Sequence, residues 1–320
     1  MKVFITRVIP EVGLKLLTDA GIEFELWKEK RDLTQEELIN RCKQFDALLS
    51  VGGNKIDKVF LQACSHLKII SLMSVGYDNV DVPAALKTGI PITNTPGVLS
   101  GATADTAFLL MLAVSRKAFY LHKKIINGDW GFYEPTADLG IELNGKTLGI
   151  FGLGKIGFEM AKRCIGAYGM KVIYYNRGIN EEAERVLNAT RVSFDQLLQQ
   201  SDVLTIHTSL TAETKDKFDL AAFNKMKREA IFINTARGGV HKEEDLIRAL
   251  DDKLIWGAGL DVTNPEPMHA GNALLQMPNV AVLPHIGSAT FETRNAMAEI
   301  AARNIIAVYR NEALPNPVLS

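Results

Sequence analysis

The chain has 320 residues, of which 47% are hydrophobic and 23% charged, and its formal net charge is −1. This composition is typical of a globular protein and excludes a chain that is disordered over most of its length. Because the charge is so nearly balanced, nothing suggests nucleic acid or an anionic membrane as the main partner. The length is sufficient for two domains of ordinary size.

The three cysteines, Cys42, Cys64 and Cys164, lie far apart and form no CxxC pair. This pattern predicts buried thiols in a reducing, cytoplasmic compartment, with no disulfide framework and no metal site. The apolar run at the N-terminus is too short for a signal peptide. The longest apolar segment, residues 107–114, is much shorter than a membrane-spanning helix.

The first hundred residues alternate short apolar strands with helices. Strands are predicted at 2–6, 46–51, 67–73 and 91–94, and helices at 10–20, 57–64 and 82–87, with a capping box at Thr34–Glu37. The alternation predicts a parallel sheet covered by helices on both faces. The turn that follows strand 67–73 contains Gly76, whose backbone N–H could face an anion; an ordinary strand-to-helix turn is the alternative.

Residues 102–126 predict one long helix that is more apolar than a surface helix, which suggests burial between domains or subunits. An aromatic loop with Trp130, Phe132 and Tyr133 follows it. The purely structural interpretation of this loop is a local cluster that covers the end of the helix.

The strongest motif is Gly152-Leu-Gly154-Lys-Ile-Gly157, which follows an apolar strand and opens a helix that reaches Tyr168. A second strand, 171–175, comes next, so the glycines stand in the strand–turn–helix–strand context of a dinucleotide site. Gly152 permits the tight turn, Gly154 lets the backbone approach a pyrophosphate, and Gly157 lets the helix pack closely on its strand. The free N–H groups at the helix start would face the phosphates.

The end of the second strand indicates which dinucleotide is bound. An acidic residue there would accept hydrogen bonds from the ribose hydroxyls of NAD(H), but this chain has Asn176 and Arg177. A neutral amide followed by a guanidinium suits a 2′-phosphate, so we expect NADP(H) to be preferred, with NAD(H) possible. The alternative is that Arg177 is a solvated charge and that both cofactors are used.

Further strands are predicted at 203–207, 230–234, 255–260 and 280–283, with helices between them, and a last long helix at 290–310. We therefore expect an α/β protein of two doubly wound parallel-sheet domains. A Rossmann nucleotide domain, residues 99–288, is inserted into a flavodoxin-like substrate or lid domain, residues 1–98 plus 289–320.

Three polar residues follow successive strands of the nucleotide domain: Arg237, Glu266 and His285. Since parallel strands end at one edge of a sheet, these side chains should share an edge with the glycine turn. Arg237 can hold a carboxylate and polarise a neighbouring carbonyl. His285 can give a proton to the alkoxide as hydride arrives, and Glu266 can orient the imidazole and favour its charged form. Taken singly, each could be a surface or structural residue.

Three other residues lie near this edge. Asp261 ends a strand and could contact the nicotinamide. His207 also ends a strand and could face the cofactor, although no partner is close to it in the sequence. We expect His241 to be a surface residue or a helix cap.

The motifs around residues 152–157, 234–238, 259–267 and 283–290 together resemble the D-isomer-specific 2-hydroxyacid dehydrogenases over nearly the whole chain. Within that family the chain is most similar to glyoxylate/hydroxypyruvate reductases. The resemblance implies substrate-carboxylate contacts from the backbone of Val75 and Gly76, and Arg237, Glu266 and His285 as the catalytic trio. The cofactor contacts that it implies are Thr103, Gly154, Lys155, Ile156, Arg177, Ser209, Thr235 and Asp261.

The resemblance also implies a homodimer joined through the nucleotide domains, with a small 2-ketoacid or 2-hydroxyacid as substrate. The expected activity is NADPH-dependent reduction of glyoxylate to glycolate and of hydroxypyruvate to D-glycerate. Tyr133 stands where tryptophan is expected in a loop that reaches toward the partner's active site, which leaves fine substrate choice open. Reduction of 2-ketogluconate or another D-2-hydroxyacid dehydrogenase activity is one alternative, and a dinucleotide-sensing, corepressor-like binding protein is the other.

Overall fold

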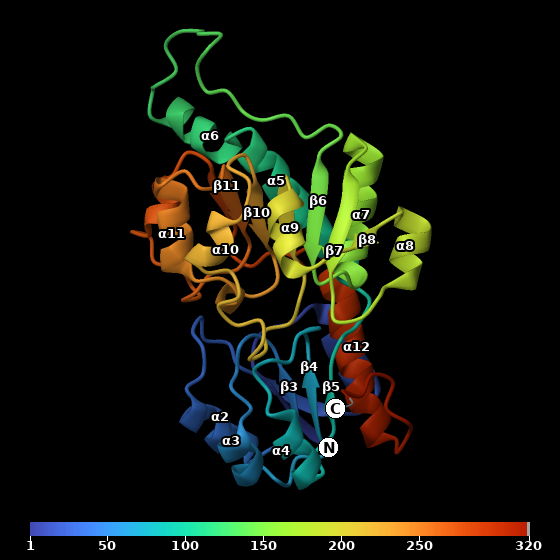
Figure 1. Ribbon diagram of the computed structural model, residues 1–320. Coiled ribbons are helices and arrows are strands. Elements are labelled where there is room, and N and C mark those ends of the chain that lie inside the picture. The colour runs from blue at the N-terminus through green and yellow to red at the C-terminus, as the bar shows by residue number, and fades with distance from the viewer. Residues whose placement is uncertain (319–320) are drawn as a thin grey trace. The chain divides into compact units, whose positions relative to one another are not determined.

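The computed structural model describes residues 1–318, which fall into two compact units: Met1–Leu99 with the segment from Ser288 onward, and Ser100–Gly287. Residues 319 and 320 of the predicted first domain lie outside the described part. Each unit is built on one parallel sheet (Figure 1). The predicted α/β class with two doubly wound sheets is confirmed.

The first unit has a five-stranded sheet in the order β2-β1-β3-β4-β5. Its strands are β1 Lys2–Ile5, β2 Glu23–Leu26, β3 Ala47–Ser50, β4 Ile69–Leu72 and β5 Ile92–Thr93. Its helices are α1 Glu11–Asp19, α2 Gln35–Cys42, α3 Lys58–Ala63, α4 Val82–Thr88 and α12 Phe291–Tyr309. Helices α1 and α12 pack together, α12 lies against β3 and β4, and α2, α3 and α4 form a second layer. The sheet is buried because its strands carry apolar residues on both sides.

Local signals explain where these helices begin. The capping box predicted at Thr34–Glu37 is present: Thr34 Oγ1 accepts the Glu37 N–H at 3.2 Å, and Glu37 Oε2 accepts the Thr34 N–H at 2.8 Å. The short strand β2 has no counterpart among the predicted strands, because its residues Glu23–Leu26 are only partly buried and carry two glutamates. Cys42, Cys64 and Cys164 are free and buried, as predicted.

The second unit has a seven-stranded sheet in the order β12-β11-β10-β9-β6-β7-β8. Its strands are β6 Thr147–Phe151, β7 Lys171–Tyr175, β8 Thr190–Arg191, β9 Val203–Ile206, β10 Ile231–Asn234, β11 Gly257–Leu260 and β12 Val280–Val282. Its helices are α5 Ser100–Ser115, α6 Ala118–Ile126, α7 Lys155–Tyr168, α8 Glu181–Leu187, α9 Phe194–Gln200, α10 Leu220–Asn224 and α11 Glu243–Asp251, with 3-10 turns at Gly238–Val240 and Ala273–Gln276. The strand order reverses between β6 and β9, which is the switch point where open α/β sheets bind ligands.

Two apolar cores enclose this sheet. One joins α5 and α7 to the sheet through residues such as Leu110, Ile150 and Met160. The other joins α9, α10 and α11 to the opposite face through Phe151, Phe223 and Leu246. Burial of each such side chain stabilises the fold by about 1.5–3 kcal/mol, so the carboxyl edge of the strands rests on a rigid base.

The single helix predicted at 102–126 is wrong in its continuity. The chain forms two helices, α5 and α6, because Lys117 adopts a left-handed conformation with φ 53°. The carbonyl of Ser115, at the end of α5, accepts the N–H of Ile141 instead of continuing the helix. The apolar character of α5 arises from packing against α7, β10, β11 and β12 within its own unit.

The aromatic loop does not form a local cluster over the end of the helix. Trp130, Phe132 and Tyr133 are 72%, 85% and 78% exposed and cover nothing within their unit. Residues 128–145 run out past the end of α6 as a long loop before the chain returns to β6 (Figure 1).

Candidate active site

The glycine turn lies between β6 and α7, at the switch point of the sheet. Gly152 has φ 93°, and a Cβ there would lie 2.8 Å from the His207 carbonyl oxygen, so the turn admits no side chain. Gly157 packs close to Ile150, whose Cγ2 would lie 3.0 Å from an added Cβ. These constraints match the roles predicted for the first and third glycines.

Gly154 is the N-cap of α7, and the space around its Cα is open. No side chain caps the helix, so the N–H groups of its first residues, Lys155 and Ile156 among them, are available to an anion. The sequence, the open approach and the uncapped helix fit a dinucleotide pyrophosphate.

The loop after β7 is tied to this turn by the amide of Asn176. Its Oδ1 accepts the Leu153 N–H at 2.7 Å, and its Nδ2 donates to the Leu153 carbonyl at 3.1 Å. The Asn180 amide donates to the same carbonyl at 2.9 Å. The Asn176 side chain is therefore occupied within the protein, whereas Arg177 is exposed.

The other predicted cofactor contacts lie around the same edge of the sheet. Thr103, in the first turn of α5, is buried beside Gly287: its Cγ2 would lie 3.3 Å from a Cβ there. Thr235 is buried directly after β10. Ser209 lies in the loop after β9, where its carbonyl accepts the Thr214 hydroxyl at 2.7 Å.

His285 and Glu266 meet in the structure. The Nδ1 atom of His285, just after β12, contacts Oε1 of Glu266 in the loop after β11. Both side chains are about half exposed, at 48% and 40%. The backbone of His285 is left-handed, with φ 54°, a conformation that costs energy in a residue with a side chain.

Asp261 holds the chain immediately after His285. Its carboxylate accepts the N–H groups of Ile286 and Gly287, each at 2.8 Å. Burial raises the pKa of Asp261, and these two hydrogen bonds together with the nearby His285 oppose that rise. The sequence suggested only a nicotinamide contact for Asp261. In the structure its carboxylate fixes the left-handed turn that presents the imidazole.

Arg237 reaches the same edge from the end of β10. Asn234 orders its loop by donating through Nδ2 to the Arg237 carbonyl and accepting the Ala236 N–H through Oδ1, both at 2.9 Å. Gly238 abuts the Thr263 carbonyl so closely that no Cβ would fit. The Arg237 loop is thereby pressed against the loop that carries Glu266.

The charges in this group favour an ionised Glu266. Burial acts to raise the pKa of its carboxyl group, but the hydrogen bond and charge of His285, the Thr263 backbone and the Arg237 charge outweigh it, and the pKa is lowered. Glu266 can thus serve as the anion that orients the imidazole. The described residues bring Arg237, Glu266 and His285 together, as the strand order predicted.

His207 and His241 both lie near the carboxyl ends of the strands. The Nε2 atom of His207 lies 2.9 Å from Thr205 Oγ1, and its Nδ1 lies 3.5 Å from Thr235 Oγ1, so it does have partners, which the sequence did not indicate. Burial lowers its pKa to about 3.

His241 is fully buried, so its predicted surface position is wrong. Its Nδ1 lies 3.0 Å from Asn234 Nδ2, and it packs against Phe232, because residue 241 forms a bridge with Phe218 after the 3-10 turn. Burial lowers its pKa to about 4. The position of His241 in the sequence, four residues after Arg237, did not indicate that its side chain is buried.

Val75 and Gly76 lie in the first unit, in the turn after β4. Side chains hold both of their carbonyls: Asn94 Nδ2 donates to Val75 at 2.9 Å, and Ser74 Oγ donates to Gly76 at 2.7 Å. Over residues 1–318, the N–H groups of Val75 and Gly76 have no hydrogen-bond acceptor. A fixed turn with two open donors can bind a carboxylate.

Two other kinds of site are absent from the described residues 1–318. No group of three or more His, Cys, Asp and Glu side chains in that range is placed to hold a metal ion. No helix in the same range has both the length and the apolar character needed to cross a membrane.

Known proteins similar to this chain belong to one family. Residues 108–287 match the model of the D-isomer-specific 2-hydroxyacid dehydrogenase NAD-binding domain. The glyoxylate reductase of Thermococcus litoralis is 45% identical over 321 aligned residues, covering 99% of this chain and 96% of that protein.

Solved structures agree with this match. The TT0316 protein of Thermus thermophilus superposes with a TM-score of 0.92 at 40% identity, with both chains fully covered. An NADPH-dependent glyoxylate/hydroxypyruvate reductase of Sinorhizobium meliloti, solved with NADP and malonate, superposes with a TM-score of 0.86 at 30% identity, covering 99% of this chain and 96% of that one. With its nucleotide-binding unit matched and its full length aligned to such relatives, the chain belongs to the D-isomer-specific 2-hydroxyacid dehydrogenase family.

Proposed function

We propose that this protein is an NADPH-preferring reductase of small 2-ketoacids, which converts glyoxylate to glycolate and hydroxypyruvate to D-glycerate. The observation that carries the proposal is the contact between His285 and Glu266, with Arg237 beside them at the edge of the sheet that holds the glycine turn. The glyoxylate reductases among its relatives support the choice of substrate.

In the proposed reaction, the bound nicotinamide supplies a hydride to the keto carbon of the substrate. Arg237 holds the substrate carboxylate and polarises the carbonyl. His285 donates a proton to the developing alkoxide. Glu266 keeps the imidazole in one orientation and stabilises its charged form.

The first unit is proposed to be the substrate or lid domain. The open N–H groups of Val75 and Gly76 are suited to hydrogen-bond the carboxylate of a 2-ketoacid. A rigid turn that binds the carboxylate would fix the keto carbon for hydride transfer.

The second unit would bind the dinucleotide. Its pyrophosphate would lie on the glycine turn and the start of α7, and Thr103, Ser209, Thr235 and Asp261 would contact the rest of the cofactor. Arg177 is exposed in the loop after β7 and supports NADP(H) over NAD(H), because a guanidinium attracts a 2′-phosphate. The end of β7 also lacks the acidic residue that would bind the ribose hydroxyls of NAD(H). The Sinorhizobium meliloti relative, described as NADPH-dependent, supports the same preference.

We further infer a cytoplasmic homodimer. The exposed Trp130, Phe132 and Tyr133 form an apolar surface of the kind that a partner subunit covers. Free, buried cysteines support a reducing compartment.

The test is oxidation of NADPH and NADH, followed at 340 nm, with glyoxylate, hydroxypyruvate, pyruvate and 2-ketogluconate. We expect the highest kcat/KM with NADPH and the two small ketoacids. A preference for 2-ketogluconate would assign the enzyme to sugar-acid reduction. Cofactor binding without turnover of any substrate would favour a dinucleotide sensor.

A further inference from the structure

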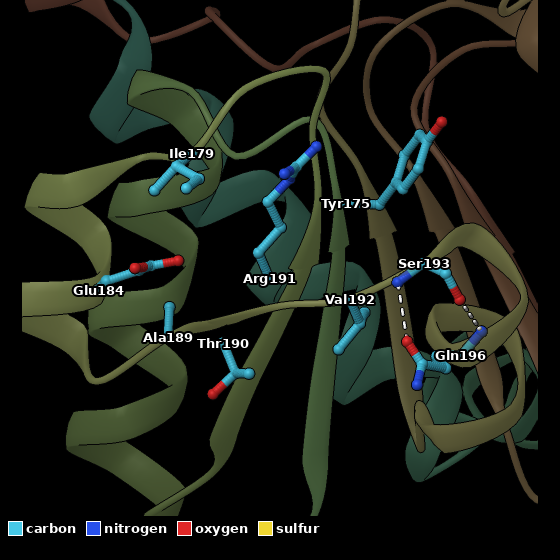
Figure 2. A pocket seen from close by; sticks show the side chains of 9 residues that line it. All are labelled: Tyr175, Ile179, Glu184, Ala189, Thr190, Arg191, Val192, Ser193 and Gln196. Atoms are coloured by element: carbon cyan, nitrogen blue, oxygen red, sulfur yellow. Dashed lines mark hydrogen bonds between the residues drawn. The ribbon is translucent and has the colours of Figure 1, made fainter.

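Arg191 is a residue that the predicted site did not include. It ends β8, a two-residue edge strand that pairs with β7 through Tyr174 and Arg191. Its guanidinium donates through Nε and Nη2 to the carbonyl of Asn176, at 3.2 and 3.0 Å, and through Nη2 to the carbonyl of Arg177, at 2.9 Å. In Figure 2, the Arg191 side chain points toward the end of the sheet where Tyr175 lies.

These bonds complete the fixation of the loop after β7. From one side, the Asn176 amide ties the loop to Leu153 in the glycine turn. From the other side, Arg191 holds the carbonyls of both residues that stand at the end of the strand. The backbone that presents the Arg177 side chain is therefore set by a guanidinium as well as by the strand.

The same contacts place the Arg191 guanidinium beside the backbone of Arg177. Within residues 1–318, neither Arg177 nor Arg191 has a carboxylate within 4.0 Å, unlike Arg31 or Arg163. Glu184 lines the hollow beside Arg191, but its Oε1 accepts the Tyr174 hydroxyl at 2.8 Å. Among the described residues, both guanidiniums therefore lack a protein anion, and each would attract a dianion bound at this loop.

Space and donors for an anion are present. Arg191 is exposed and borders a hollow of about 560 Å³ that also reaches Tyr175 and Ile179 (Figure 2). Its Nη1 makes no hydrogen bond to any of residues 1–318, because Nε and Nη2 carry the bonds to the loop. A guanidinium can thus hold the backbone with one edge and still offer N–H groups to a phosphate.

We propose that Arg191 is a second determinant of cofactor choice, which fixes the backbone of residues 176 and 177 and adds its charge to that of Arg177 at the 2′-phosphate of NADP(H). The inference rests on the proposed function, in which the dinucleotide binds at the glycine turn. It extends the site to an edge strand that carries no part of the recognised motif.

The test uses two probes that differ only in the 2′-phosphate: adenosine 2′,5′-bisphosphate and 5′-AMP. Their dissociation constants are measured by titration calorimetry, beside those of NADPH and NADH. The variants are Arg191→Ala, Arg191→Gln and Arg177→Ala. Arg185→Ala is the matched control, because Arg185 is an exposed arginine of the neighbouring helix α8 without a bond to the loop.

We expect Arg191→Ala to weaken binding of the bisphosphate and of NADPH by about 10- to 100-fold, the usual effect of losing charge-assisted contacts, and to weaken binding of 5′-AMP and NADH less than about 3-fold. Arg191→Gln, which keeps an amide donor for the carbonyls but has no charge, should fall between wild type and Arg191→Ala. Arg185→Ala should bind all four ligands like wild type.

Equal weakening of both probes in Arg191→Ala and Arg191→Gln would overturn the proposal, because it would make Arg191 a purely structural residue. Unchanged binding in both variants would also overturn it. If wild type itself shows no preference for the 2′-phosphate, the NADPH preference fails and this inference fails with it. A preference that is lost in Arg177→Ala but kept in both Arg191 variants would refute only the role of Arg191. Melting temperatures of all variants identify any that do not fold.

Discussion

At the scale of single residues, the proposed chemistry depends on how His285 is held. Its left-handed backbone is unfavourable on its own, and two contacts maintain it: Glu266 on the imidazole and Asp261 on the following backbone. The lowered pKa of Glu266 keeps the orienting group negative. The imidazole is thus oriented before substrate binds, as general-acid catalysis requires.

Replacement of Glu266 by Gln tests this arrangement. The lowered pKa keeps the Glu266 carboxylate ionised to more acidic pH than an ordinary glutamate. In wild type, the anion is therefore present throughout the neutral range. The variant has no anion at any pH. We expect kcat for glyoxylate reduction at pH 7 to fall by about 100-fold.

The loss of kcat in Glu266→Gln should persist over the whole pH range in which Glu266 of the wild type is ionised. Steady-state rates between pH 5 and 9, with chemistry shown to limit by a deuterated cofactor, provide the measurement. Glu244→Gln, at an exposed position in the first turn of α11, controls for loss of a negative charge. A variant profile that coincides with that of wild type would refute the role of Glu266.

At the scale of elements, the loops at the carboxyl edge are positioned by close backbone contacts. Gly238 abuts the Thr263 carbonyl, which brings the loop after β10 against the loop after β11. Gly152 abuts the His207 carbonyl, which brings the glycine turn against the loop after β9. Side chains at either position would separate loops that carry the candidate site.

Gly238→Ala and Gly239→Ala form a matched pair. A Cβ at 238 meets a backbone carbonyl, whereas at 239 it meets the side-chain end of Leu210 at 3.2 Å, which can move. We expect Gly238→Ala to lower kcat/KM for glyoxylate at least about 10-fold, because a small displacement of Arg237 weakens transition-state contacts. Gly239→Ala should stay within about 3-fold of wild type. Equal activities of the two variants would show that this contact does not position Arg237.

The sequence predicted most of these elements and missed those whose order comes from tertiary contacts. The glycine motif and the strands that precede Arg237 and His285 were predictable because each has a local pattern. Strand β8 was not, since Thr190 and Arg191 have no apolar alternation and pair only with an already formed β7. The break at Lys117 was missed for a similar reason: the returning segment at Ile141 bonds to the end of α5 from far along the chain.

At the scale of the whole molecule, buried histidines tie stability to pH. His241 is fully buried, and burial lowers its pKa to about 4 from 6.5. The unfolded chain therefore binds a proton between these values that the folded chain does not. Stability should be constant in this respect above pH 6.5 and decrease as the pH falls from 6.5 toward 4, by a total of about 3 kcal/mol for this residue.

Urea denaturation followed between pH 7.5 and 4.5 measures this dependence. Below pH 6.5, the slope of the unfolding free energy against pH should be smaller in His241→Asn than in wild type, by up to the contribution of about one bound proton. This difference does not depend on how far the substitution changes the absolute stability. His122→Asn, which removes an exposed histidine of α6, serves as the control. An unaltered slope in His241→Asn would contradict the assignment of His241 as a neutral buried group.

The order of the parallel strands also explains how much of the site could be predicted. The order of strands along the chain was enough to place Arg237, Glu266 and His285 on one edge, because parallel strands end together. It could not show that Asp261 binds backbone N–H groups, that Asn176 turns toward Leu153, or that His241 is buried, because these depend on side-chain directions that no spacing encodes.

The central claim is that His285 supplies the proton when this protein reduces a small 2-ketoacid. The most direct measurement compares wild type with His285→Ala in NADPH oxidation by glyoxylate at pH 7, with NADPH binding determined separately by fluorescence. If His285 is the proton donor, kcat should fall by at least about 100-fold in His285→Ala, while the NADPH dissociation constant stays within about 3-fold of wild type. A variant that keeps most of the wild-type kcat, or a wild-type protein that binds NADPH and reduces no 2-ketoacid, would contradict it.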